Sequence, residues 1–119
     1  MTQHDDPSRL RHMLDAARKA VEFSSGKDRG SLDSDEKLLL SLTRLLEIIG
    51  EAAKNVSPEL CKKHPEIPWK DIAGTRDRLS HGYFDVDSEE LYAICKNHIP
   101  MLIETVKTMI GDLRNGATP

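Results

Sequence analysis

The sequence predicts an all-α protein, an antiparallel helical bundle of four main helices and a short connecting helix. Apolar residues recur at three- and four-residue spacing along most of the chain. Leucine, isoleucine and alanine dominate the apolar set, which suits helices better than sheets. No segment alternates apolar and polar residues over a useful length, as a strand would. Short polar stretches between the periodic segments indicate antiparallel neighbours.

Length and charge limit the class of protein. A chain of 119 residues suits one domain, and we expect tails at 1–6 and 115–119 around a single domain at 7–114. The net charge of -3 lacks the overall basic signature of nucleic-acid binders, so any RNA contact requires a local basic patch. A mean hydropathy of -0.50, with no long apolar run, argues against a membrane span. The polar N-terminus does not resemble a secretory signal, so we expect a cytoplasmic protein.

The first helix is expected to begin at Asp6-Pro7, an N-cap residue followed by proline at the first helical position. It should end near Ser24, and a polar loop should continue to about Leu32. Its apolar residues lie at helical spacing: Leu10, Met13, Leu14, Ala17, Ala20 and Val21.

The second helix is expected to begin after Asp33 or Ser34 as its cap. Leu40 falls on the far face among charged residues, and such a helix usually has a second partner, which here could be another subunit. Gly50 inside this helix costs about 1 kcal/mol relative to alanine, which close approach of another backbone would compensate. One stripe contains Leu38, Leu42, Leu45, Ile49, Ala52 and Val56, widened by Leu39, Leu46 and Ala53.

Proline and acidic residues mark the remaining helices. Ser57-Pro58 should open a short helix that ends at His64. Pro68-Trp69 should open a third main helix that Gly82 ends, with one side formed by Trp69, Ile72, Ala73, Arg76 and Leu79.

The last helix should begin at Asp87–Glu90, which has the form of a capping box, and run to about Leu113. Pro100 removes a backbone donor, so we expect a kink near Lys96 and Asn97. The inward residues should be Leu91, Ile94, Cys95, Leu102, Ile103, Val106 and Ile110, with His98 on the same stripe as a hydrogen-bonded core histidine.

The chain has two cysteines, Cys61 and Cys95, and free thiols are the default in a reducing compartment. Cys61 and His64 have the spacing of two metal ligands on one helical turn, but two ligands do not make a zinc site. We therefore expect no bound metal.

The segment from Gly74 to Asp85 concentrates residues that carry chemistry. The guanidinium of Arg76 is always charged and suits a phosphate. The imidazole of His81 can take and give a proton near neutrality. Together they are sufficient for metal-free phosphodiester cleavage, in which His81 handles the proton of the 2′-hydroxyl or leaving oxygen and Arg76 stabilises the phosphorane.

The spacing of Arg76 and His81 leaves alternatives open. Five residues turn a regular helix by about 140°, so either the helix ends before His81 or a second copy of the chain completes the site. An arginine and a histidine at a helix C-terminus are also favoured by the helix dipole alone. Glu47 and Glu51 form a turn-spaced acidic pair, either a solvated face or a wall of the active cleft.

Four segments together resemble the HepT family of HEPN-domain proteins, over about Ser8 to Leu113. The family signature is Arg, four residues, His, any residue, Tyr, which is Arg76, His81 and Tyr83 here. The segments are LEIIGEAAK from Leu46 to Lys54, HPEIPW from His64 to Trp69, IAG from Ile72 to Gly74, and the stretch from Arg76 to Asp87.

The resemblance implies a homodimer whose two motifs face one cleft, and a metal-independent RNase without a cofactor, with tRNA as a substrate class. It implies the toxin of a type VII-like toxin–antitoxin pair, neutralised when an MntA-like nucleotidyltransferase antitoxin transfers AMP to Tyr83. Asp77 stands where the family commonly has Asn, and with Glu51 it is a candidate supporting residue. A different hypothesis, favoured by Asp77 and the acidic net charge, is a non-catalytic module that binds a nucleotidyltransferase partner or a nucleotide.

Overall fold

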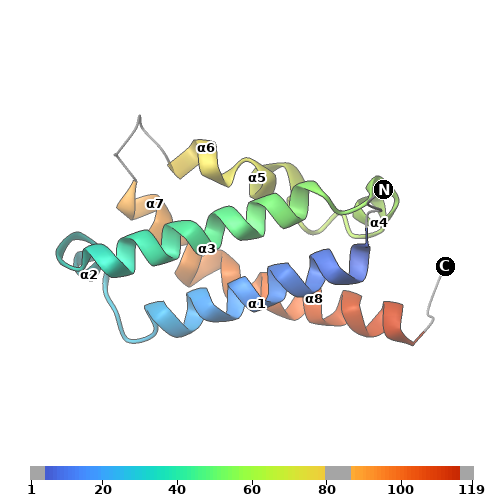
Figure 1. Cartoon of the computed structure of the whole chain (residues 1–119), viewed down its shortest axis with the longest axis horizontal. Coiled ribbons are helices and arrows are strands. Elements are labelled where there is room, and N and C mark those ends of the chain that lie inside the picture. Colours follow the sequence, from blue (N-terminus) through green and yellow to red (C-terminus); the bar gives the residue numbers. More distant parts are fainter. Residues whose placement is uncertain (1–4, 80–86, 116–119) are drawn as a thin grey trace.

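Three long helices lie along the long axis of the protein. The structure is a computed structural model that describes residues 5–79 and 87–115, without the side chains of Arg76 and Arg78. In Figure 1, α1 runs antiparallel to both α3 and α8. The long helices are α1 (Asp6–Ser24), α3 (Glu36–Lys54) and α8 (Ile99–Arg114). The predicted all-α class is confirmed, since the described residues form helices and no strand.

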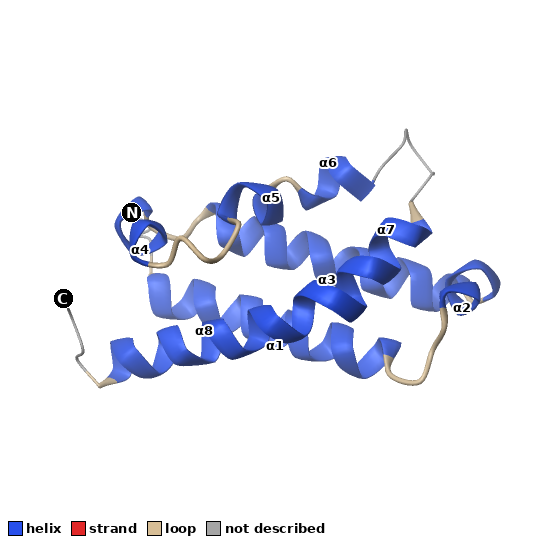
Figure 2. Ribbon diagram, turned by 180° about the vertical axis from the view of Figure 1, so that it is seen from behind, coloured by secondary structure: helices blue, strands red, loops and turns tan. Residues whose placement is uncertain are grey.

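Short helices connect the long ones. They are α2 (Arg29–Ser34), α4 (Pro58–Lys63), α5 (Trp69–Ala73), α6 (Thr75–Leu79) and α7 (Ser88–Ala93). A π-helical turn, η1 (Ile94–His98), joins α7 to α8. Figure 2 shows this run from behind, where α7 continues into the long C-terminal helix.

The start of α1 differs from the prediction by one residue. Asp5 is the N-cap and accepts the backbone N–H of Ser8 at 3.4 Å. Asp6 instead accepts from Ser57, from its backbone N at 2.9 Å and its Oγ at 2.7 Å. Asp6 therefore ties the start of α1 to the cap of α4, a long-range contact that sequence patterns do not report.

The predicted loop up to Leu32 is wrong, because α2 begins at Arg29 and occupies its second half. Asp28 caps α2 by accepting the backbone N–H of Ser31 at 2.9 Å, and the side chain of Leu32 is buried. The cap of α3 is then Asp35, which accepts the backbone N–H of Leu38 at 3.1 Å, rather than Asp33 or Ser34. A six-residue helix carries too few apolar residues to show a period.

The predicted third main helix is broken in two at Gly74. The backbone N–H of Gly74 bonds to Lys70 O at 2.9 Å, and α6 starts at the next residue. Glycine in a helix interior is unfavourable because it loses the most backbone freedom. The predicted end at Gly82 lies outside the described residues.

The core and the C-terminal kink follow the prediction. All six residues of the α3 stripe are buried, and Leu40 is 57% exposed. The predicted kink is the π-turn η1, which contains Lys96 and Asn97. Because Pro100 has no N–H, the carbonyl of Lys96 loses its helical partner there.

His98 was predicted wrongly, because its side chain is exposed and Ile99 is buried in its place. The π-turn is wider than an α-turn and shifts the residues that follow it around the helix axis. Among the described residues, no helix is long and apolar enough to cross a membrane.

Candidate functional site

The helix that carries the motif arginine is held by buried residues on either side of it. Thr75 and Leu79 are both buried, and Thr75 Oγ1 donates to Asp71 O at 3.2 Å. The backbone N–H of Asp77 bonds to Gly74 O at 3.0 Å, which holds the first turn of α6. These contacts fix where the backbone of Arg76 lies, while His81 and Tyr83 lie outside the described residues.

The residues that flank the segment 80–86 are bonded to each other. The backbone N–H of Asp87 donates to Leu79 O at 2.8 Å. The side chain of Asp87 accepts the backbone N–H of Glu90 at 3.0 Å and so caps α7. The prediction that Asp87 caps this helix is therefore confirmed. The backbone N–H of Asp87 also joins the residue that follows the segment 80–86 to the residue that precedes it.

A cluster on α2 anchors the same end of α7. Arg29 Nη1 donates to Ser88 Oγ at 2.9 Å, and Arg29 Nη2 lies 2.8 Å from Asp33 Oδ2. Ser88 Oγ donates to Asp33 Oδ1 at 3.3 Å. Contacts between residues 59 and 55 positions apart thus hold the start of α7 beside α2.

The glycine in α3 sets how closely the motif helix approaches. A Cβ added to Gly50 would lie 2.8 Å from the carbonyl oxygen of Ile72, in α5. The predicted close approach of another backbone is confirmed. Only glycine at this position allows α5, and the α6 that follows it, to lie directly against α3.

A groove of about 540 Å³ crosses the outer face of α3. In Figure 1, α3 runs between α1 on one side and α5 and α6 on the other. The α3 residues form its floor, α1 contributes one wall, and α5 and α6 contribute the other. The lining residues are Arg9, His12, Arg44, Glu47, Ile48, Gly50, Glu51, Ala52, Lys54, Asn55, Ala73 and Asp77.

Two predicted supporting residues, Glu51 and Asp77, line this groove. Both are exposed, and they come from different elements, α3 and α6. Glu47 lines it too and is paired with Arg44 at 3.4 Å. The acidic pair therefore lies on the floor of the groove, with Glu51 exposed and Glu47 half-buried. The groove reaches α6 at Asp77, the residue next to Arg76 in the chain.

Sequence reasoning did not include Arg9 and His12 among the site residues. The side chain of His12 is exposed. Arg9 and His12 are three residues apart on α1, so they share a helix face. That spacing was visible in the sequence, but only the packing of α1 against α3 shows that this face borders the groove.

The cysteines have ordinary structural roles. Burial raises the pKa of the Cys95 thiol to about 11. Burial, and then the nearby charge of Asp6, raises the pKa of the Cys61 thiol. A raised pKa disfavours the thiolate, which is the form that attacks substrates and binds metals. Among the described residues, no three His, Cys, Asp or Glu side chains gather as a metal site would require.

Comparisons with known proteins identify the family. Residues 13–109 match the family model described as ribonuclease HepT-like. A protein of Caldanaerobacter subterraneus subsp. tengcongensis named as a "putative RNase" is 38% identical over 101 residues, which are 85% of this chain and 90% of that protein. A "probable ribonuclease HepT" of Thermococcus cleftensis is 47% identical over 68 residues, 57% of this chain and 62% of that protein.

A further relative, from Methanocaldococcus jannaschii and also named as a "putative RNase", is 31% identical over 113 residues, which are 95% of this chain and 93% of that protein. No solved structure matches the chain. The matched residues contain α3, most of the core and positions 76 to 83, whereas Arg9 and His12 of the groove precede them. This chain belongs to the ribonuclease HepT-like family.

Proposed function

We propose that this protein is a metal-independent endoribonuclease in which Arg76 and His81 are the catalytic residues. The observation that carries the proposal is the match of residues 13–109 to the ribonuclease HepT-like family, a span within which Arg76, His81 and Tyr83 lie. The described part of the structure supports it, because the groove beside α6 is of a size that accommodates a nucleotide.

The chemistry follows from the two side chains. The imidazole of His81 removes the proton of a ribose 2′-hydroxyl, and the oxygen attacks the neighbouring phosphorus. The guanidinium of Arg76 stabilises the charge that builds up on the phosphorane oxygens. The bond to the 5′-oxygen breaks and that oxygen takes up a proton, which leaves a 2′,3′-cyclic phosphate and a 5′-hydroxyl. No metal ion is required, because Arg76 supplies the positive charge.

We also propose that the protein acts as a homodimer and that its substrate is RNA, tRNA in particular. Leu40 is 57% exposed on α3, an apolar side chain on an otherwise charged face. A second copy that covers Leu40 would also resolve the spacing of Arg76 and His81, since each site could then draw on two chains.

We propose further that a partner protein regulates this activity. The protein serves as the toxin of a type VII-like toxin–antitoxin pair, and an MntA-like nucleotidyltransferase neutralises it by transferring AMP to Tyr83. The transferred AMP places a phosphate and a base next to the residues that bind the RNA phosphate, so it competes with substrate.

The test is induced expression of the wild type and of His81→Ala without any partner, while growth and the integrity of total tRNA are followed. Growth arrest with shortened tRNA is expected for the wild type and is lost in His81→Ala. His98→Ala is the matched control, because His98 is exposed and does not line the groove beside α6. Intact RNA and normal growth with all three, at equal soluble expression, would reject the RNase.

That negative result would favour the second candidate, a non-catalytic module that binds a nucleotidyltransferase partner or a nucleotide. The observation in its favour is the exposed carboxylate of Asp77 in the groove, at a position where it repels phosphate. Co-purification with such a partner that is equal for the wild type and His81→Ala, without RNA cleavage, would establish it.

A further inference from the structure

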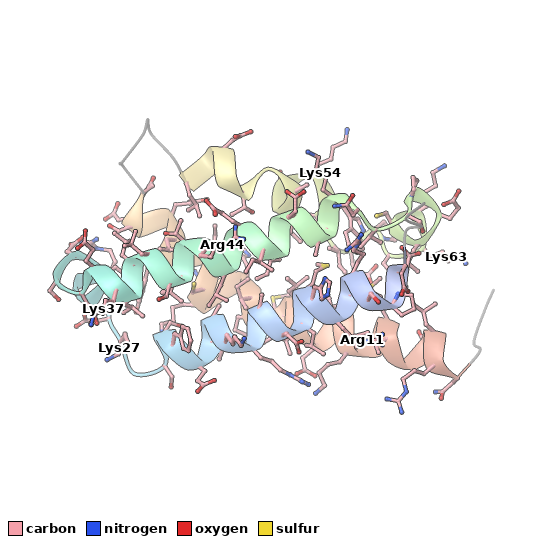
Figure 3. All side chains as sticks on the ribbon, viewed as in Figure 1. Arg11, Lys27, Lys37, Arg44, Lys54 and Lys63 are labelled. Carbon is pink, nitrogen blue, oxygen red and sulfur yellow. The ribbon has the colours of Figure 1, made fainter. Side chains whose placement is uncertain are left out.

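The groove is basic on the side opposite α6. Arg9 and His12 of α1 line it, and Lys54 lies at the end of α3. Figure 3 shows Arg44 over the middle of α3 and Lys54 projecting near the end of that helix. On the other wall, Asp77 marks the position of α6. The groove therefore runs from the motif helix, across α3, to a cluster of positive charge.

Arg9 is in an unusual state for a surface arginine. Its Nε is buried and has no hydrogen-bond partner within the described part of the chain. A buried donor without a partner is costly, and arginine groups of this kind are normally satisfied by a carboxylate or a phosphate. Neither Arg9 nor Lys54 forms an ion pair with a described side chain, whereas Arg44 is paired with Glu47.

We infer that this groove is an RNA-binding subsite in which Arg9, His12 and Lys54 bind backbone phosphates that flank the bond to be cleaved. The inference rests on the proposed RNase function and extends it to residues outside the motif. It also explains how a chain of net charge -3 binds RNA, since Arg9, His12 and Lys54 gather in one groove.

The acidic floor favours RNA over a simple anion. Glu51 is exposed in the groove and forms no ion pair with a described residue. A carboxylate repels inorganic phosphate, but it accepts hydrogen bonds from the amino groups of bases. A ligand that offers both phosphates and donors fits the two kinds of residue together.

The experiment measures RNA binding separately from cleavage. The probe is a short fluorescein-labelled oligonucleotide with 2′-O-methyl groups, which lacks the 2′-hydroxyl nucleophile and cannot be cut. Fluorescence anisotropy at several salt concentrations gives the affinity of the wild type, Arg9→Gln and Lys54→Gln. Arg11→Gln is the matched control: it removes the same charge from the same helix, but Arg11 is exposed and does not line the groove. In Figure 3 the label of Arg11 lies on the side of α1 away from α3.

We expect Arg9→Gln to weaken binding about tenfold, the loss of one charge-assisted phosphate contact. The slope of log affinity against log salt should fall by about 0.7, the value for one phosphate contact on a single strand. Lys54→Gln should lower the same slope with a smaller loss of affinity. Because Lys54 is exposed, Lys54→Gln tests the proposed subsite even if Arg9→Gln does not fold. Circular dichroism melting checks the folding of each variant.

Cleavage of unmodified tRNA by the same proteins separates this inference from the proposed function. Arg9→Gln should raise KM and leave kcat within about twofold, the pattern of lost ground-state binding. Wild-type affinity and KM in both Arg9→Gln and Lys54→Gln, beside an active wild type, would overturn the subsite and leave the RNase intact. Weaker binding of AMP or inorganic phosphate, with unchanged RNA binding, would make the groove a small-anion site and also overturn it. A wild type that neither binds nor cleaves RNA would reject both.

Discussion

Gly50 of α3 and the carbonyl oxygen of Ile72 in α5 are packed so closely that an added Cβ would lie 2.8 Å from that oxygen. This contact sets the distance between the core helix α3 and the segment that carries Arg76. The close packing of α5 on α3 therefore both stabilises the core and positions the segment that carries Arg76.

Gly50→Ala should destabilise the protein by about 1–3 kcal/mol, because overpacking against a backbone carbonyl outweighs the gain in helix propensity. It should also lower RNase activity, since α5 and α6 must move away from α3. Urea unfolding and tRNA cleavage measure the two effects. Gly111→Ala is the control: Gly111 lies in α8 with no atom within 4 Å of an added Cβ, so the change should stabilise by up to about 1 kcal/mol. Equal effects at the two glycines would contradict the packing argument.

Asp87→Ala should cost about 1 kcal/mol by removing the cap of α7. It should reduce RNase activity as well, because loss of the side-chain cap loosens the start of α7, where the backbone N–H of residue 87 bonds to Leu79 O across the segment 80–86. Asp35→Ala removes a cap of the same kind from α3, far along the chain from the motif, and is expected to keep its activity. The measurements are thermal melting and the initial rate of cleavage. Full activity in Asp87→Ala would show that α7 does not position the motif.

Cys95 should make the protein sensitive to alkali. Its pKa is about 11 in the folded protein and 9.0 in the exposed reference, so between these values the folded state holds a proton that the unfolded state has lost. The free energy of unfolding should therefore fall as pH rises from about 9 to 11, by about 3 kcal/mol at most from this group. Urea unfolding of Cys95→Ala should show a shallower loss over that range than the wild type, whatever its stability at neutral pH. Parallel slopes would rule out this contribution.

Leu40→Glu should shift the protein from dimer to monomer in light scattering after gel filtration, if a second copy covers Leu40. A charge buried at an apolar interface is costly unless it is paired. Met101→Glu is the comparison, because Met101 is 71% exposed on α8 rather than α3. Leu40→Glu should also lose RNase activity if the site draws on two chains. A dimer that persists in Leu40→Glu would place the interface elsewhere.

Tyr83→Phe should abolish modification by a nucleotidyltransferase of the proposed class, since the phenolic oxygen that accepts AMP is removed. Mass spectrometry after co-expression should show one added AMP on the wild type and none on the variant. The variant should still arrest growth when the partner is co-expressed. Tyr92→Phe is the matched control, because Tyr92 is the other tyrosine and lies in α7. AMP still found on Tyr83→Phe would point to a different acceptor.

Much of the fold could be predicted because its signals are local. The buried stripe of α3, the exposed Leu40 and the cap at Ser57 follow from spacing and capping chemistry alone. Short elements could not be predicted in the same way. A helix such as α2 spans less than two turns and shows no period, and the break at Gly74 depends on how α5 packs on α3.

The sequence by itself determined the helical class, the family and the candidate catalytic pair of Arg76 and His81, because helical periodicity and a fixed motif spacing are properties of the chain. The tertiary structure alone decided which residues share the groove. Arg9 and Asp77 are far apart in the chain, and they line the same groove only because α1 and α6 pack beside α3. The tertiary structure also decided that His98 is exposed, because the π-turn that places it outside the core depends on how the C-terminal helix accommodates Pro100. A one-dimensional pattern reports which residues share a face, and packing decides what that face meets.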